Sequence, residues 1–94
     1  MRAGIFIFLL VSVAFAQIPK PAGFVNDFAG IIDDGSESLI SLNLDALEKE
    51  TAVEIVVVTI SALPAGETIQ TYSNKLLNEW GIGKQGADNG LLIL

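Results

Sequence analysis

Hydrophobic residues recur along this chain with two spacings, and these spacings predict its helices and strands. Residues 53–60 are mostly β-branched, with little alternation after Glu54, which is typical of a strand covered on both faces. Residues 90–94 form a second apolar run of this kind. Apolar positions at helical spacing predict amphipathic helices over 36–50 and 68–80. Because strand, helix and strand in this order form a βαβ unit, we expect an α/β domain with a mostly parallel sheet.

Both predicted helices carry residues that are typical of helix ends. Asp34 is expected to cap the first helix, with Glu37 three residues later completing a capping box. Gly81 follows the second helix, where glycine commonly adopts the left-handed conformation that ends a helix. The first helix should pack through a broad apolar face made of Leu39, Ile40, Leu42, Leu44, Ala46 and Leu47.

The residues before the first helix divide into an extended part and a packed part. Pro19 and Pro21 favour polyproline geometry, so residues 17–23 are expected to form a Pro-rich linker. Residues 24–34 mix apolar anchors with three aspartates and are expected to form a packed loop. The domain itself is therefore expected over residues 24–94.

The first 16 residues differ in kind from the rest, since 13 of them are hydrophobic. Arg2 supplies a positive start, residues 5–11 are continuously apolar, and Ala14 and Ala16 place small residues before a cleavage point. This layout predicts a secretory signal peptide over 1–16 and an exported protein, whether periplasmic, extracellular or membrane-attached. A transmembrane anchor would need roughly 20 apolar residues, more than this segment offers. A buried core helix fits poorly with the Ala-Phe-Ala end.

Composition and charge exclude several classes of function. Five basic and eleven acidic side chains give a net charge of −6, and the lysines are scattered singly, so we expect no nucleic-acid partner. The chain has no Cys and no His, which removes disulfides, thiolate nucleophiles and imidazole bases, and we expect neither zinc nor haem. Ser36, Ser38 and Ser61 have no His or Lys base near them in sequence, so a serine hydrolase has no support and the catalytic residues stay unknown.

Residues 81–86 match the G-x-G-x-x-G letters of the dinucleotide fingerprint. That fingerprint lies after a strand and opens a helix, so that pyrophosphate meets the helix N-terminus. Here the order is reversed, with a helix before and a strand after. We therefore expect a helix cap and a tight loop, with no nucleotide cofactor.

Oxygen-rich side chains and aromatic residues supply the remaining candidate sites. Asp27 and Asp88 lie in short loops beside apolar anchors, and loop carboxylates are the ligands that Ca²⁺ or Mg²⁺ prefers. Ordinary turn chemistry is the alternative for Asp88. Tyr72 and Trp80 could stack on a ligand, but their spacing on one helix face favours a place in the core.

Three blocks in this order resemble the TPM domain family. The first block runs from Pro21 to Ile32 and contains Phe24-Val25-Asn26-Asp27. The second block runs from Leu47 to Thr59. The third block runs from Asn78 to Leu94 and contains Asn78-Glu79-Trp80-Gly81 and Asp88-Asn89-Gly90. The resemblance implies a three-layer α/β/α sandwich with Rossmann-like layering and a mostly parallel sheet. In this chain the sandwich would be truncated after its second core strand. One departure is Ala52, where the family commonly has glycine after Thr51, so the turn there is expected to be tighter or shifted.

The resemblance also implies two alternative functions. Family members are exported or membrane-attached, and some are associated with acid phosphatase activity, with photosystem II repair or with calcium binding. One hypothesis is a divalent-metal-dependent phosphatase acting on phosphomonoesters, with Asp27 and Asp88 holding the ion. The other is a non-enzymatic calcium-binding module that assists the assembly of membrane protein complexes. Because the chain stops inside an apolar run, we expect it to be a fragment of the domain, without a function by itself.

Overall fold

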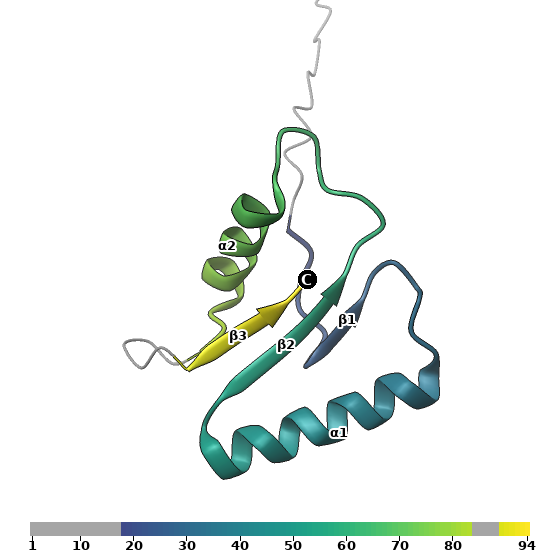
Figure 1. Cartoon of the computed structure of the whole chain (residues 1–94), viewed down its shortest axis with the longest axis vertical. Coiled ribbons are helices and arrows are strands. Elements are labelled where there is room, and N and C mark those ends of the chain that lie inside the picture. The colour runs from purple at the N-terminus through teal and green to yellow at the C-terminus, as the bar shows by residue number, and fades with distance from the viewer. Residues whose placement is uncertain (1–17, 84–88) are drawn as a thin grey trace, which may run out of the picture.

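The computed structural model describes residues 18–83 and 89–94, and within them the sheet lies between two helices (Figure 1). Neither of these helices has the length and apolar character needed to span a membrane. The predicted leader lies outside the described residues. The elements in chain order are β1 (Val25–Asp27), α1 (Asp34–Thr51), β2 (Glu54–Thr59), α2 (Ile69–Trp80) and β3 (Gly90–Ile93).

The three strands form one parallel sheet in the order β1-β2-β3. Val25 lies opposite Val57 on one side of the central strand, and Glu54 lies opposite Gly90 on the other. A parallel pair needs a crossover connection, which α1 supplies between β1 and β2 and α2 between β2 and β3. The predicted α/β class is thereby confirmed, with helix, sheet and helix as its layers.

The core lies between β2 and α2. Val56 and Val58 project from the strand onto Tyr72 and Leu76 of the helix, and Val58 and Leu76 are only 1% and 0% exposed. The side chain of Tyr72 is thus part of the core, as its spacing indicated. The i, i+4 spacing of these two helix residues is what puts both on the face that meets the sheet.

Helix α1 packs less deeply than its apolar sequence predicted. Ile40, Leu44 and Leu47 are half-buried, whereas Leu39 and Leu42 are 62% and 67% exposed. An α-helix turns only one stripe towards a sheet, so a face as broad as the predicted one cannot be covered by a single neighbouring layer.

Strand β1 was not among the predicted elements, because residues 24–34 were expected to form a loop. The strand has three residues, and its middle residue, Asn26, is polar yet only 2% exposed. The Asn26 side chain accepts from Ala22 N at 2.6 Å and donates to Gly23 O at 3.0 Å. These bonds satisfy the buried amide, and a single buried polar residue hides a short strand from a hydrophobicity pattern.

The N-terminal cap of α1 is Asp33, and the prediction of Asp34 was wrong by one residue. Asp33 has an extended backbone, with φ −70° and ψ 157°, while Asp34 is already helical. The Asp33 carboxylate accepts from Ser36 N at 3.0 Å and from Ser36 Oγ at 2.8 Å. Adjacent aspartates can both cap a helix in principle, so only the backbone geometry separates them.

Both helices end on a residue in the left-handed conformation. Gly81 ends α2 with φ 63°, as its sequence position indicated. Ala52 ends α1 at the same φ of 63°, and its N–H donates to Glu48 O at 2.8 Å. The turn is therefore not shifted by the alanine. Instead the alanine adopts a conformation in which its Cβ lies close to the following carbonyl oxygen, at a cost of about 1–2 kcal/mol.

We expect Ala52→Gly to raise the free energy of unfolding by about 1 kcal/mol, because glycine has no Cβ to strain at this φ. The Ala52 side chain is exposed, so its removal sacrifices little packing. Urea unfolding of the two proteins measures the difference. The matched control is Gly81→Ala, which introduces the same strain at the end of α2 and should lower the free energy by a similar amount. A stability loss for Ala52→Gly would contradict this account.

Candidate functional site

The parallel sheet has a carboxyl edge, where all three strands end, and an amino edge, where they begin. Asp27 and Thr59 are the last residues of β1 and β2, and they lie opposite each other in the strand register. In open α/β sheets, ligands bind outside the carboxyl ends of the strands. The fold thus brings one of the two predicted metal-binding aspartates, Asp27, to the edge where such sites occur.

The Asp27 carboxylate is held by three donors. Its Oδ1 accepts from Thr59 Oγ1 and from Ile31 N at 3.1 Å, and its Oδ2 accepts from Ile32 N at 2.9 Å. The backbone oxygen of Asp27 also accepts from Gly30 N at 3.1 Å. One side chain therefore joins the end of β1 to the end of β2 and shapes the turn that leads into α1.

These hydrogen bonds favour the charged carboxylate. The hydroxyl of Thr59 and the backbone N–H groups of Ile32 and Ile31 lower the pKa of Asp27 below its ordinary value, and partial burial opposes them only in part. An ionised carboxylate offers about four lone-pair sites, and three donors leave capacity for a cation. Asp27 can thus act as a brace of the fold and still contribute one charged ligand.

The second predicted metal ligand, Asp88, lies outside the described residues. Its neighbour Asn89 is described: its Nδ2 donates to Ala52 O at 2.6 Å, and its O accepts from Glu54 N at 2.9 Å. These contacts are at the amino edge, opposite the edge of Asp27. Within residues 18–83 and 89–94, no three acidic side chains lie together as a metal site would require. A joint ion site of Asp27 and Asp88 stays a prediction.

The loop after α2 is shaped by close backbone packing. A Cβ built on Gly83 would lie 2.8 Å from Gly90 N, so a side chain larger than hydrogen would collide with the start of β3. Gly81 ends α2, and Gly83 allows the loop to pack closely against Gly90. Both roles agree with the predicted helix cap and tight loop. Residues 84–88, which include the last glycine of the motif, lie outside the described part.

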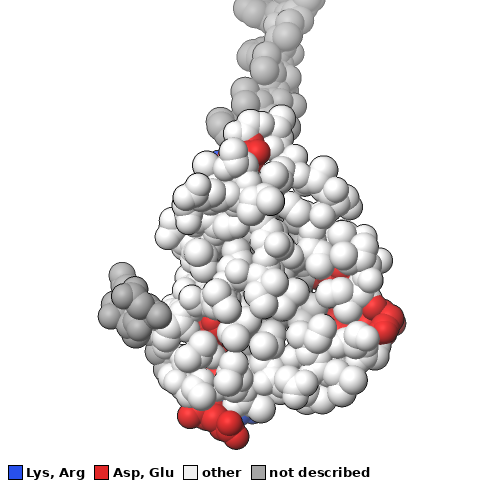
Figure 2. All heavy atoms as spheres, in the orientation of Figure 1, with Lys and Arg blue, Asp and Glu red and all other residues white. Residues whose placement is uncertain are grey.

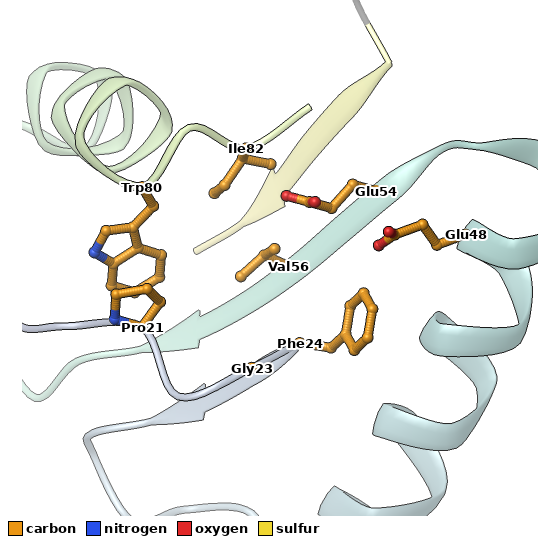
Figure 3. Close-up of a pocket in the computed structure, with 8 residues that line it drawn as sticks. All are labelled: Pro21, Gly23, Phe24, Glu48, Glu54, Val56, Trp80 and Ile82. Atoms are coloured by element: carbon orange, nitrogen blue, oxygen red, sulfur yellow. The ribbon is translucent and has the colours of Figure 1, made fainter. Parts of the chain in front are cut away.

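A pocket opens at the amino edge of the sheet, and sequence reasoning did not predict it (Figure 3). Its volume is about 260 Å³. Glu48 of α1 and Glu54 of β2 line one side, where the Glu54 carboxylate is directed towards Ile82 and the Glu48 side chain points from α1 towards β2 (Figure 3). The other walls are largely hydrophobic. The hydrophobic lining includes Phe24, Val56, Trp80 and Ile82.

Trp80 holds the N-terminal segment against this pocket. Its Nε1 donates to Pro19 O at 2.8 Å, and its ring meets Phe28 edge to face at a centroid distance of 6.4 Å. Ile18 packs against the core, and Pro21 forms part of the pocket wall beside the indole (Figure 3). The prolines therefore run along the domain in an extended form. The sequence indicated Trp80 as a core or ligand-stacking residue, and this was the only feature in the sequence that pointed to the pocket.

Charged side chains are sparse on the face seen in Figure 2, where acidic groups lie mainly at the margins. Two lysines are paired, Lys49 with Asp45 at 2.8 Å and Lys75 with Glu67. Both pairs are solvent-exposed on the lysine side and contribute little to stability.

Residues 25–94 match the family model of the TPM domain. The chain belongs to the TPM domain family. The match covers most of the chain and confirms the resemblance of the three sequence blocks. No curated protein matches the chain. In this TPM domain, the family region begins at the first residue of β1, so the Pro-rich segment that Trp80 holds lies before it.

We expect Thr59→Val to raise the pKa of Asp27 towards its ordinary value, because the Thr59 hydroxyl contributes most to lowering it. A carboxyl with a lowered folded-state pKa stabilises the fold above its unfolded pKa, and this stabilisation is lost as the pH falls through the folded value. The variant of the TPM domain should therefore unfold at a higher pH during acid titration. NMR of the carboxyl carbons, combined with acid unfolding curves, measures both effects.

The matched control for this prediction is Ser36→Ala. It removes the hydroxyl that lowers the pKa of Asp33 and leaves the donors to Asp27 in place. An Asp27 pKa that is the same in Thr59→Val and wild type would contradict the role given to this hydrogen bond.

Proposed function

We propose that this protein is an exported TPM-domain phosphatase that acts on phosphomonoesters with the help of a divalent cation. The observation that carries the proposal is the position of Asp27, an ionised carboxylate at the carboxyl edge of a parallel sheet. That edge is where α/β folds bind their ligands. Asp27 combines this position with a lowered pKa, so its carboxylate is charged at neutral pH.

The donor set fits a hard cation in part. Ca²⁺ takes about six to eight oxygen ligands and Mg²⁺ keeps several waters, and Asp27 offers carboxylate oxygens with lone pairs to spare. Asp88 is next in sequence to Asn89, whose contacts lie at the opposite edge of the sheet, so an ion at Asp27 would take its remaining ligands from water and the phosphate group. A bound cation polarises a phosphoryl oxygen or an attacking water. The role of Asp27 is to hold charge at the site, and the role of Thr59 is to fix the orientation of that carboxylate.

We expect the full-length domain to hydrolyse a generic phosphomonoester such as p-nitrophenyl phosphate with added Ca²⁺ or Mg²⁺ and to lose this activity in a chelator. The Asp27→Asn variant should be at least about tenfold slower, because an amide replaces the charged ligand. Asp33→Asn is the matched control: it alters an aspartate of the same connection, and asparagine is an equally good helix cap. Equal rates for Asp27→Asn and the wild type would contradict the proposed mechanism.

A second candidate function is a non-enzymatic, calcium-stabilised module that assists membrane protein complexes. The observation in its favour is that both Asp27 oxygens already brace the turn between β1 and α1. An ion added there would stiffen the fold without a catalytic group beside it. For this candidate, calcium raises the melting temperature by mass action while no phosphomonoester is turned over.

Export is the remaining part of the proposal, supported by the three-part leader in residues 1–16. We expect expression in a secreting host to yield a mature chain that begins at Gln17, detected by mass spectrometry of the intact protein. Ala16→Phe should block processing, because the residue before the cleavage point must be small. Ala3→Val, near the start of the leader, is the control and should be processed normally. A mature protein that still begins at Met1 would contradict export by this route.

A further inference from the structure

We propose that a second pocket, at the carboxyl edge beside Asp27, binds the organic group of the phosphomonoester and selects esters of hydrophobic alcohols. The inference rests on the proposed phosphatase function and extends it to the class of substrate. This carboxyl-edge pocket has a volume of about 340 Å³, which is within the range of small-molecule sites. Residues that follow each strand contribute to it, namely Ile31 after β1, Ile60 after β2 and Leu94 after β3. It therefore lies where open α/β sheets bind their ligands.

The carboxyl-edge pocket shares two of its lining residues with the Asp27 site. Thr59 lines the pocket, and its hydroxyl donates to the Asp27 carboxylate. Ile31 also lines the pocket, and its N–H donates to the same carboxylate oxygen, Oδ1, at 3.1 Å. The residues that orient the charged group thus form part of the pocket wall. A substrate whose phosphate lies at Asp27 would place its organic group at the mouth of this pocket.

The lining of this pocket favours an uncharged, apolar group. Apart from Thr59, each of its described lining residues is aliphatic, and none of them carries a charge. Ile31 and Ile69 are largely exposed, so a bound hydrocarbon group would remove their apolar surface from water. A sugar or a nucleoside would bring several polar groups, and among the lining side chains only the Thr59 hydroxyl can pair with them. The pocket therefore favours an aryl or branched alkyl alcohol.

The pocket acts on specificity and makes no bond itself. Hydrolysis adds water at phosphorus, breaks the bond from phosphorus to the ester oxygen, and releases inorganic phosphate and the alcohol. Benzyl alcohol and methanol are nearly equally acidic, so a difference in rate between their phosphate esters reports on the organic group. In the full-length domain with Ca²⁺ or Mg²⁺, kcat/KM for benzyl phosphate should exceed that for methyl phosphate at least about tenfold. Equal values for the two hydrolysed esters would overturn the pocket and leave the phosphatase function standing.

A binding measurement without turnover separates this inference from the proposed function. Benzylphosphonate, which has no ester bond to hydrolyse, should shift the methyl NMR signals of Ile31, Leu63 and Ile69 in a saturable manner. Its affinity should exceed that of methylphosphonate at least about tenfold. Such binding in a domain that hydrolyses neither ester would support the pocket and contradict the phosphatase function. The lack of a saturable shift at these methyl groups would overturn the pocket, whatever the hydrolysis rates.

Variants of exposed residues test the pocket with little risk to the core. Leu63→Gln with Ile69→Gln should reduce the preference for benzylphosphonate over methylphosphonate at least about fivefold. Ala62→Phe, which fills the pocket from an exposed position, should reduce this preference as well. The matched control is Leu39→Gln with Leu42→Gln, which makes the same kind of exchange at exposed positions of α1 outside this pocket and should keep the preference. An equal reduction in both double variants would overturn the site.

Discussion

The central strand β2 is the constraint on which the rest of the described structure depends. It pairs in parallel on both sides, so each neighbouring strand must be reached by a crossover, and each crossover here is a helix. Its two faces are both covered, which is why Glu54 to Thr59 reads as a β-branched run without alternation. The same pairing sorts the loops into two groups. The turns that begin the helices gather at the carboxyl edge, and the connections that follow them gather at the amino edge.

Each edge carries its own chemistry. At the carboxyl edge a single carboxylate, Asp27, is charged and braced by a hydroxyl and two backbone N–H groups. At the amino edge Glu48 and Glu54 line one side of a pocket whose other walls are largely hydrophobic. Acidic groups at both edges agree with the net charge of −6.

Periodicity alone predicted β2, β3 and both helices, since each has a long or strongly patterned apolar stripe. It could not predict β1, because three residues with a buried asparagine between them have no pattern to detect. The sequence identified Asp27 as a candidate ligand but not its brace, since Thr59 is 32 residues away and meets it only through strand pairing. The pocket could not be predicted for the same reason: Glu48 and Glu54 belong to different elements, and the turn at Ala52 brings both to one pocket.

The hydrogen bond from Trp80 to Pro19 has a consequence for the order of events during biogenesis. It closes a loop of 61 residues, so this contact cannot form until α2 has been synthesised and folded. In a chain that is processed after Ala16, the cleavage point lies three residues from the anchored proline. A peptidase needs an accessible, extended segment on both sides of the bond that it cuts. If the proposed leader is removed after Ala16, its removal and the closure of the fold over Pro19 would involve the same few residues.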